Sequence, residues 1–450
     1  MRPPALSYRE AVDAVTSRGR FGIGLGLERI GRLLDALDHP ERGLRGALVG
    51  GTNGKGSVVA LAGSALTAAG LRVGTMPKPH LVAYRERICI DGTPVDPQGF
   101  AAAVARVLPA ADTVAAELGP PTEFETLTAA AVGELARSGI DLALVEVGMG
   151  GRLDATNALD PGVAAITNVQ LDHERYLGHT LAAIGTEKAA IIKRGNLAVT
   201  GASGRGLQPI VERCAAVDVP LRQAGKGQAY RAAVRDLGWN GTVVDARTPG
   251  GDLRGLRLGL LGSHQAANAT VALALLDALR EDAARRGRPL AGLDESALRR
   301  GFAVARWPGR MELLDAGPRL GRVLLDGAHN PAGARALARS LANLGLRRFP
   351  LVFGAMRGKR VGAVLRALAA LEPRPVFTGV DDPKAHRPEA LARAWRRAAP
   401  GSSAESVAEP EAALARAAAL RRAAEPLVVA GSLYLVGAVR GLLTGATDEV

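Results

Sequence analysis

Segments with the character of buried strands alternate with segments of helical length through most of this chain, and this alternation limits its fold more than any other feature. The first strand candidate, residues 45–50, runs into a glycine-rich turn and then into an apolar helix candidate that ends at Gly70. Such alternation favours a parallel, doubly wound sheet, which binds ligands beyond the carboxyl ends of its strands. Further strand candidates are residues 71–75, 141–148 and 163–167, and further helix candidates are residues 122–139, 180–193 and 263–280.

A charged stretch, residues 280–296, ends this first pattern, and a second alternation begins after residues 307–310. We therefore expect an α/β protein with a parallel-sheet domain over residues 1–300 and a smaller domain over residues 308–450. Segment 222–258 alternates like a strand and contains several glycines, which predicts a β excursion or a hairpin region. The second alternation contains the strand candidates RVLLDG, PLVFG, PVFTG and PLVVAG, with helices from about residues 331, 361, 387 and 410.

The composition of the 450 residues excludes several classes of protein. We find no uninterrupted apolar run near the ~20 residues that a membrane helix needs, and Glu10 and Asp13 lie where a signal peptide would be apolar. Cys89 and Cys214 show no spacing typical of a disulfide framework, which fits a reducing compartment. We expect a soluble, cytoplasmic protein with no membrane partner.

The net charge of +13 comes mainly from arginine, because only seven of the 57 basic residues are lysine and the 50 arginines are scattered. Aromatic residues make up 3% of the chain, too few for a platform that stacks nucleic-acid bases. We expect no nucleic-acid partner, whereas attraction for small anionic ligands stays open. In so arginine-rich a chain, a lysine can mark a position that requires a primary amine.

A glycine-rich turn separates the first strand candidate from the first helix. Such a turn directs free backbone N–H groups and the helix dipole at an anion, so it suits phosphate groups. Lys55 would reach the β- and γ-phosphates of a nucleotide, and the Ser57 hydroxyl would bind Mg²⁺. A glycine separates this lysine from the serine, unlike in the standard P-loop, and an ordinary glycine-rich turn is the alternative. The turn consists of Gly51, Thr52, Asn53, Gly54, Lys55, Gly56 and Ser57.

Three further polar residues lie at or after strand ends. Glu146 ends a buried strand candidate and suits Mg²⁺, which takes few protein oxygens beside substrate phosphates. His173 follows the candidate at 163–167, so three strand ends converge on one site. Lys188 lies in an apolar stretch of a helix. The alternatives are a solvated carboxylate, a structural histidine and a solvated lysine.

Ten short motifs follow one another across about residues 21–437. Together they closely resemble the folylpolyglutamate synthase and dihydrofolate synthase family, within the Mur ligase superfamily. The resemblance implies a P-loop-type ATPase domain followed by a smaller Rossmann-like domain, with the active site in the cleft between them. The motifs are GTNGKGS, PHLVAYRERI, EFETLTAAA, EVGMGGRLDATN, ITNVQLDH, EKAAIIK, HQAANA, WPGRME, LLDGAHNP and GSLYLVG.

The cofactors that the resemblance implies are ATP and two Mg²⁺ ions. One ion would be held by Ser57 and Glu146, and the second by Glu146 and His173. Lys188 matches the lysine that such enzymes carry as a carbamate, an anion able to bind Mg²⁺. ATP would lie on the turn at 51–57 and contact three residues elsewhere, which are Asn268, Arg310 and Asp326.

The implied reaction is an amide ligation of small molecules. ATP phosphorylates a pteroate or folate carboxylate, and the amine of L-glutamate then displaces phosphate. Lys55, His173, Lys188 and Arg310 would serve catalysis, and domain closure would exclude water. We expect a monomer, because both interfaces that the reaction needs lie within the chain. Substrate contacts are assigned to Lys78, His80, Arg85, Asp154, His329 and Ser432.

Several positions depart from the family pattern, and some alternatives stay open. Lys78 stands where a hydroxyl is usual, Ala190 replaces a glycine, and residues 358–360 replace an acidic, basic, acidic triplet. A muramyl-peptide ligase is the alternative within the superfamily; a P-loop kinase, a nucleic-acid-binding ATPase and a pure binding module are the others. The sequence leaves open whether dihydropteroate, folyl polyglutamates or both are extended, and family habit favours both.

Overall fold

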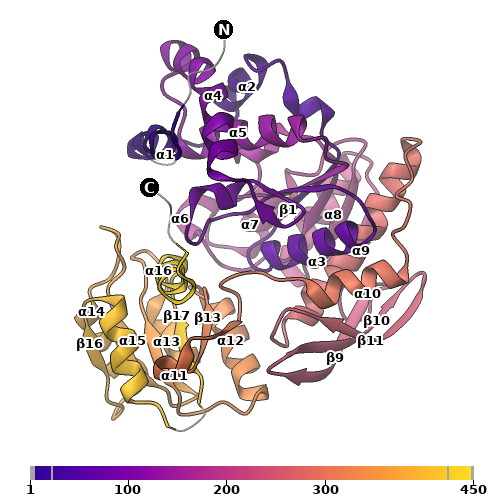
Figure 1. The fold of residues 1–450 in the computed structure, drawn as a ribbon. Coiled ribbons are helices and arrows are strands. Elements are labelled where there is room, and N and C mark those ends of the chain that lie inside the picture. Colours follow the sequence, from indigo (N-terminus) through magenta and orange to yellow (C-terminus); the bar gives the residue numbers. More distant parts are fainter. Residues whose placement is uncertain (1–5, 22–23, 423–424, 447–450) are drawn as a thin grey trace.

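The computed structural model describes residues 6–21, 24–422 and 425–446. These residues form an N-terminal α/β lobe, a smaller C-terminal α/β lobe and a small antiparallel sheet beside the first lobe (Figure 1). The expected fold class, a parallel-sheet lobe followed by a smaller Rossmann-like lobe, is confirmed. The outer ends of the two predicted domains, residues 1–5 and 447–450, lie outside the described residues.

The N-terminal lobe is built on an eight-stranded sheet in which β1 lies between β5 and β6. All five residues of β1 are buried, as expected for a central strand covered on both faces. Neighbouring strands are parallel except where β3 pairs with β2 and with β4. In sheet order the strands are β4 (Thr93–Pro94), β3 (Cys89–Ile90), β2 (Val73–Met76), β5 (Leu142–Glu146), β1 (Gly46–Gly50), β6 (Gly162–Ile166), β7 (Leu197–Thr200) and β8 (Leu221–Gln223).

Alternate residues of β1 enter two separate hydrophobic cores, because successive side chains of a strand point to opposite faces. Leu48 packs on one face, and Ala47 and Val49 pack on the other. The first face is covered by α1 (Tyr8–Thr16), α2 (Glu28–Asp35), α4 (Pro97–Leu118), α5 (Glu123–Arg137), α6 (Glu174–Leu177), α7 (Leu181–Ala189) and α8 (Gln208–Ala216), and the second by α3 (Lys55–Ala68), α9 (Gln265–Arg285) and α10 (Glu295–Val304).

The segment expected to form a β excursion is a three-stranded antiparallel sheet of β9 (Arg231–Gly238), β10 (Gly241–Thr248) and β11 (Gly251–Leu258). The charged stretch at 280–296 was expected to end the first pattern, but α9 runs into it and α10 begins within it. Salt bridges one helical turn apart, Arg285–Glu281 and Arg286–Asp282, accompany the continuation of α9.

Among the described residues, α4 is long and apolar enough to meet a membrane-span test based on length and composition alone. Half of its most apolar window is buried, and the helix packs against α1 and α5. It contains Pro109 and begins at the side-chain cap of Asp96. Its burial and helix contacts are those of a core helix.

The C-terminal lobe repeats the layered arrangement on a smaller scale. Leu324 of its sheet enters one core, and Val323 and Leu325 enter the other. Its sheet order is β12 (Glu312–Asp315), β13 (Arg322–Asp326), β17 (Leu427–Ala430), β14 (Pro350–Phe353), β15 (Arg374–Thr378) and β16 (Glu405–Val407), with only β12 antiparallel. One face carries α12 (Pro331–Asn343), α13 (Val361–Ala369) and α14 (Pro388–Ala398), and the other α11 (Gly317–Leu320), α15 (Pro410–Ala419) and α16 (Leu433–Thr444).

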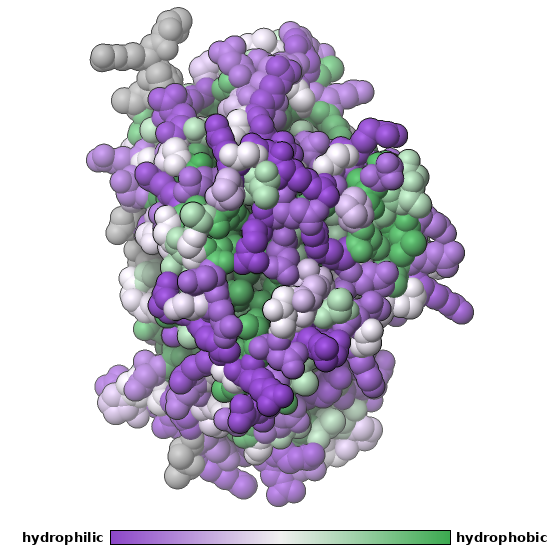
Figure 2. Space-filling model, turned by 90° about the vertical axis from the view of Figure 1, so that its right-hand side faces the viewer, coloured by the Kyte–Doolittle hydropathy of each residue, from purple (hydrophilic) through white to green (hydrophobic). Residues whose placement is uncertain are grey.

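The two lobes meet where α16 packs on the loop after β2, and Figure 1 shows α16 on the side of the C-terminal lobe that faces the first lobe. A Cβ at Gly437 would lie 1.9 Å from the Leu81 carbonyl oxygen, so only glycine permits this approach. The molecular face in Figure 2 is mostly hydrophilic, with smaller hydrophobic areas between the polar side chains. The lobes therefore join through a close backbone contact beside the loop that carries Lys78.

Candidate active site

The glycine-rich turn begins after β1 and runs into α3. It packs closely against the end of β6, against α9 and against the connection between the lobes. A Cβ on Gly51 would lie 1.9 Å from the Thr167 hydroxyl oxygen, and one on Gly54 would lie 2.3 Å from the Asn268 side-chain oxygen. A Cβ on Gly56 would overlap the Trp307 ring at 2.2 Å. Gly51 and Gly54 also have φ angles of +137° and +83°, which side chains with a Cβ rarely adopt.

Hydrogen bonds from the loop after β6 fix the shape of this turn. The Asn53 N–H donates to the Asn168 side-chain oxygen over 3.0 Å, and the Asn53 carbonyl accepts from Thr167 and Asn168. Thr52 exchanges two hydrogen bonds with the backbone of Gln170. Asn168 and Gln170 were not singled out from the sequence, although both stand in the motif ITNVQLDH.

Lys55 folds back over the turn. Its Nζ atom donates to the Gly51 carbonyl over 3.3 Å and lies 3.8 Å from Oε1 of Glu146. Glu146 ends β5, is buried and accepts a 3.2 Å hydrogen bond from the Lys78 backbone. Burial raises the pKa of Glu146, and the Lys55 charge opposes that rise. Lys55 at the start of α3 and Glu146 at the end of β5, the neighbour of β1 in the sheet, therefore face one another, as the strand order predicts.

Lys188 lies in the last turn of α7 with only 3% of its surface exposed. Its Nζ atom donates to the Gly51 carbonyl over 3.0 Å, so its amine lies against the glycine-rich turn. Burial, followed by the charge of Lys55, lowers the pKa of Lys188 to about 7. A substantial fraction of this amine is consequently uncharged at neutral pH.

His173 stands at the N-terminus of α6 with φ of +50°, beside Asp172. Burial and then the charge of Lys359 lower the pKa of His173 to about 4, so its ring is neutral at pH 7. A neutral ring leaves one nitrogen lone pair free to accept a proton or bind a metal.

Asp172 joins the two lobes. Its carboxylate accepts from Lys359 over 2.7 Å and from Asn330 over 2.9 Å, and His329 Nε2 lies 3.5 Å away. Burial alone would raise the pKa of Asp172, but His329 and Lys359 outweigh it and hold that pKa well below its usual range. Arg360 adds a second bridge, to Glu174 over 2.7 Å.

Lys78 projects a charge into the same region. Its Nζ atom lies 3.3 Å from the centre of the Phe124 ring, a cation–π contact. Burial lowers the pKa of Lys78 to about 8, although Asp154 favours the charged form. Asp154 is itself buried and accepts hydrogen bonds from the Met149 and Thr156 backbones. Among the described residues, the Lys78 ammonium makes no hydrogen bond.

Two predicted substrate residues lie elsewhere. His80 accepts a 3.0 Å hydrogen bond from Arg87 and packs on Tyr84, while Arg85 donates to the Val95 carbonyl. Neither lines the cavity that connects the two lobes, whereas Arg87 does. Their assignment as substrate contacts stays a prediction.

One cavity of about 1100 Å³ connects the two lobes. Arg310 enters it from the connection between α10 and β12, and its charge opposes the effect of burial, which raises the pKa of Asp326. Ser432 enters it as the side-chain cap of α16. Of the sequence-predicted site residues, those that line the cavity are Gly51, Thr52, Asn53, Gly54, Lys55, Gly56, Ser57, Lys78, Glu146, Asp154, His173, Lys188, Asn268, Arg310, Asp326, His329 and Ser432.

The donors in this cavity fit a metal that takes few protein ligands. No group of three His, Cys, Asp or Glu side chains in the described part of the chain could hold a metal ion by itself. The cavity offers the Glu146 carboxylate, the Ser57 hydroxyl and the His173 ring. Mg²⁺ is typically bound by one or two carboxylates, substrate phosphates and water, so this sparse set fits it.

Comparison with known proteins places this architecture in a class. Residues 49–276 match the Mur ligase middle domain, and residues 309–433 match the Mur ligase, glutamate ligase domain. The fold and the inter-lobe cavity are thus those of a Mur ligase. The predicted division into residues 1–300 and 308–450 stays a prediction.

Relatives narrow the class. The chain is 32% identical over 445 residues to a dihydrofolate synthase/folylpolyglutamate synthase of Bacillus subtilis, covering 96% of this chain and 98% of that protein. It is 35% identical over 98% of its length to a probable bifunctional folylpolyglutamate synthase/dihydropteroate synthase of Haloferax volcanii, but spans only about half (51%) of that protein. A solved structure, Mycobacterium tuberculosis folylpolyglutamate synthase complexed with ADP, is 32% identical with a TM-score of 0.87, covering 97% and 98% of the two chains.

The chain belongs to the folylpolyglutamate synthase/dihydrofolate synthase family. The resemblance read from the ten motifs is therefore confirmed. Membership in this family sets aside the kinase, nucleic-acid ATPase and binding-module alternatives, and the relatives above carry folate names rather than muramyl-peptide names.

The ion pair between the lobes generates a prediction. Lys359→Met should weaken lobe closure by about 1–3 kcal/mol, because the buried Asp172 carboxylate loses its charged donor. On that scale the open arrangement becomes at least fivefold more populated. Amide hydrogen exchange in the connection at 305–311 should accelerate accordingly. Lys226→Met, which removes an exposed lysine of the first lobe, serves as the control; equal exchange in both variants would contradict the role of the pair.

Proposed function

We propose that this protein is an ATP-dependent ligase that joins L-glutamate to dihydropteroate, to folyl polyglutamates, or to both in turn. The observation that carries the proposal is one cavity lined from both sides. The glycine-rich turn with Lys55 and Glu146 lines it from the first lobe, Arg310 from the connection, and His329 from the second lobe. A phosphate-binding turn facing a second substrate lobe suits a reaction that activates one molecule and transfers it to another. The relatives' folate names support the choice of substrates.

The proposed reaction has two steps. A substrate carboxylate oxygen attacks the γ-phosphorus of ATP, ADP leaves, and an acyl phosphate forms. The amine of L-glutamate then attacks the acyl carbon, phosphate leaves, and the amine gives up a proton. Backbone N–H groups of the turn and the Lys55 ammonium hold the transferring phosphates, and Arg310 adds positive charge from the other side. The Asp172 contacts keep the lobes together and limit hydrolysis of the acyl phosphate.

ATP and Mg²⁺ are part of this proposal. Ser57, Glu146 and His173 would hold Mg²⁺, and a carbamate on Lys188 would add an anionic oxygen. When bound, the ions neutralise phosphoryl charge. The proposal includes two ions, a monomeric enzyme and a cytoplasmic location, and the buried free thiols of Cys89 and Cys214 support a reducing compartment.

The direct test is phosphate release. Release from ATP should require both a pteroate or folate and L-glutamate, and dihydropteroate assayed against tetrahydrofolate separates the two activities. Lys55→Ala should reduce turnover by 100-fold or more with the fold intact, since its charge serves phosphate rather than the core. Lys226→Ala should behave like the wild type. Wild-type turnover in a folded Lys55→Ala protein would overturn the nucleotide assignment.

Lys78 is proposed to attract the carboxylates of the folate substrate. Its ammonium lies over Phe124 and donates to no acceptor among the described residues, so it can bind an anion in the cavity. Lys78→Ser should raise the folate KM about tenfold, or about 1.4 kcal/mol, with little change in the KM for ATP. A shift in Mg²⁺ dependence at unchanged folate KM would assign the residue to the metal site instead.

Lys188 is proposed to be carbamylated in the active enzyme. Its amine is buried against a carbonyl rather than a carboxylate, and the uncharged amine can add CO₂ to form an N–C bond with release of a proton. Arginine cannot form this group, so Lys188→Arg should be inactive although it conserves charge. Lys188→Ala should also be inactive, with partial rescue by acetate or formate.

The control is Lys193→Arg, five residues further on, where the lysine donates to the Asn157 carbonyl over 2.8 Å. This variant should stay active. With ¹³C-bicarbonate, the wild type and Lys193→Arg should give a carbamate NMR signal that Lys188→Arg lacks. An active Lys188→Arg enzyme, or a wild type without the signal, would remove the carbamate from the proposal.

A further inference from the structure

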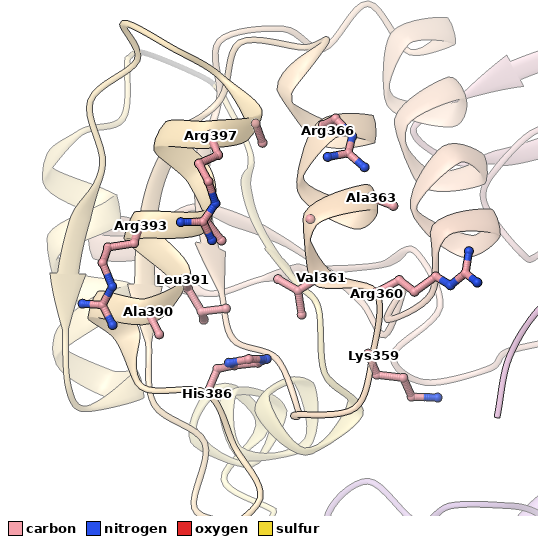
Figure 3. A pocket seen from close by; sticks show the side chains of 13 residues that line it. Lys359, Arg360, Val361, Ala363, Arg366, His386, Ala390, Leu391, Arg393 and Arg397 are labelled. Carbon is pink, nitrogen blue, oxygen red and sulfur yellow. The ribbon is translucent and has the colours of Figure 1, made fainter. Parts of the chain in front are cut away.

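A second cavity, of about 680 Å³, lies in the C-terminal lobe between α13 and α14 (Figure 3). Its charged lining is entirely basic, and among the residues that line it there is no carboxylate. We call it the arginine pocket. Its basic side chains are Lys359, Arg360, Arg366, Arg393 and Arg397, with the half-buried His386 at one end.

The five cations fall into two groups. Lys359 and Arg360 point away from α14 and form ion pairs with the N-terminal lobe (Figure 3). Arg366 of α13 and Arg393 and Arg397 of α14 lie on the two sides of the opening. Within the described ranges these three side chains have no ion pair or hydrogen bond with the protein. Three unpaired guanidinium groups around one hollow favour a ligand with several negative charges.

The arginine pocket adjoins the candidate active site. Lys359 lines both cavities, and its ammonium bonds Asp172 next to His173. Lys359 therefore marks the place where a polyanionic chain with its reacting end in the active-site cavity would pass into the pocket. We propose that the arginine pocket binds the α-carboxylates of the γ-glutamyl units of a polyglutamylated folate. This inference rests on the proposed function and adds a subsite for the tail of its substrate.

The spacing of the arginines suits such a tail. Arg393 and Arg397 are four residues apart on α14, a rise of about 6 Å. A γ-linked glutamyl unit has five bonds along its backbone, and an α-linked residue has three. An extended α-linked chain spans about 3.6 Å per residue, so an extended γ-linked chain spans about 6 Å per glutamyl unit. Successive α-carboxylates thus match successive arginines on one helix face.

The rest of the lining distinguishes this ligand from other polyanions. The floor between the two helices contains Val361, Ala390 and Leu391, which suit the methylene groups of the glutamyl units. No Phe, Tyr or Trp is among the lining residues, so the pocket offers no platform for a nucleobase beyond the His386 ring. A flexible aliphatic polycarboxylate fits both features.

The test compares substrates of different tail length on the full-length enzyme. In the double variant Arg393→Ala/Arg397→Ala, the KM for tetrahydrofolate with four γ-linked glutamates should rise about fivefold to tenfold, as expected for two partly solvated ion pairs. The KM for the monoglutamate and both kcat values should not change. The control is Arg387→Ala/Arg396→Ala, which removes two exposed arginines of the same helix region that do not line the pocket.

Binding of γ-linked tetraglutamate without a pterin, measured by calorimetry, separates this inference from the proposed function. The wild type should bind it more tightly than α-linked tetraglutamate of equal charge, and the Arg393/Arg397 variant should lose that preference. An enzyme that shows this binding but no ligation would contradict the proposed function alone. Two results for the Arg393→Ala/Arg397→Ala variant would overturn the arginine pocket as a tail site. The first is a KM that changes equally for both folates, or for neither. The second is that the variant loses binding of inorganic phosphate but keeps binding of tetraglutamate.

Discussion

The structure depends on how closely the chain packs around the turn after β1. Thr167, Asn268 and Trp307 approach Gly51, Gly54 and Gly56 so closely that a methyl group at any of the three would collide with them. These neighbours come from the end of β6, from α9 and from the connection between the lobes. Because no side chain fits between the turn and any of these neighbours, the end of β6, α9 and the connection between the lobes all pack directly against one small piece of backbone.

A second constraint operates between the lobes and is electrostatic. Asp172 is buried at the boundary and its carboxylate is stable there because Lys359 and Asn330 of the C-terminal lobe donate to it. A buried carboxylate without partners would cost free energy, so donors of the C-terminal lobe satisfy a carboxylate of the N-terminal lobe. They do so beside the cavity, from which water has to be excluded. The cavity that holds Lys55, Glu146 and Lys188 is thus closed by the same contacts that join the lobes.

The sequence predicted the parts of this site that follow from strand order. Lys55, Glu146 and His173 were expected together because parallel strands end at one edge, and all three line one cavity. Arg85 was chosen where Arg87 enters the cavity, because the segment forms a 3₁₀ helix whose side chains two residues apart point in different directions. The pair between Asp172 and Lys359 spans 187 residues, and no local pattern reveals such a contact. The helices α1, α2 and α4 also went unassigned: α1 and α2 are only nine and eight residues long, and α4 carries Pro109 in its interior.

The contact between Trp307 and Gly56 has a thermodynamic consequence. Trp307 belongs to the connection between α10 and β12, and Gly56 belongs to the turn that faces the phosphates, so the hinge region and the nucleotide site share a surface. Any nucleotide that favours one placement of this tryptophan changes the balance between lobe arrangements. By linkage, the arrangement of the lobes changes the affinity for that nucleotide by the same factor. Through the contact between Trp307 and Gly56, nucleotide binding and the arrangement of the two lobes are therefore parts of one equilibrium.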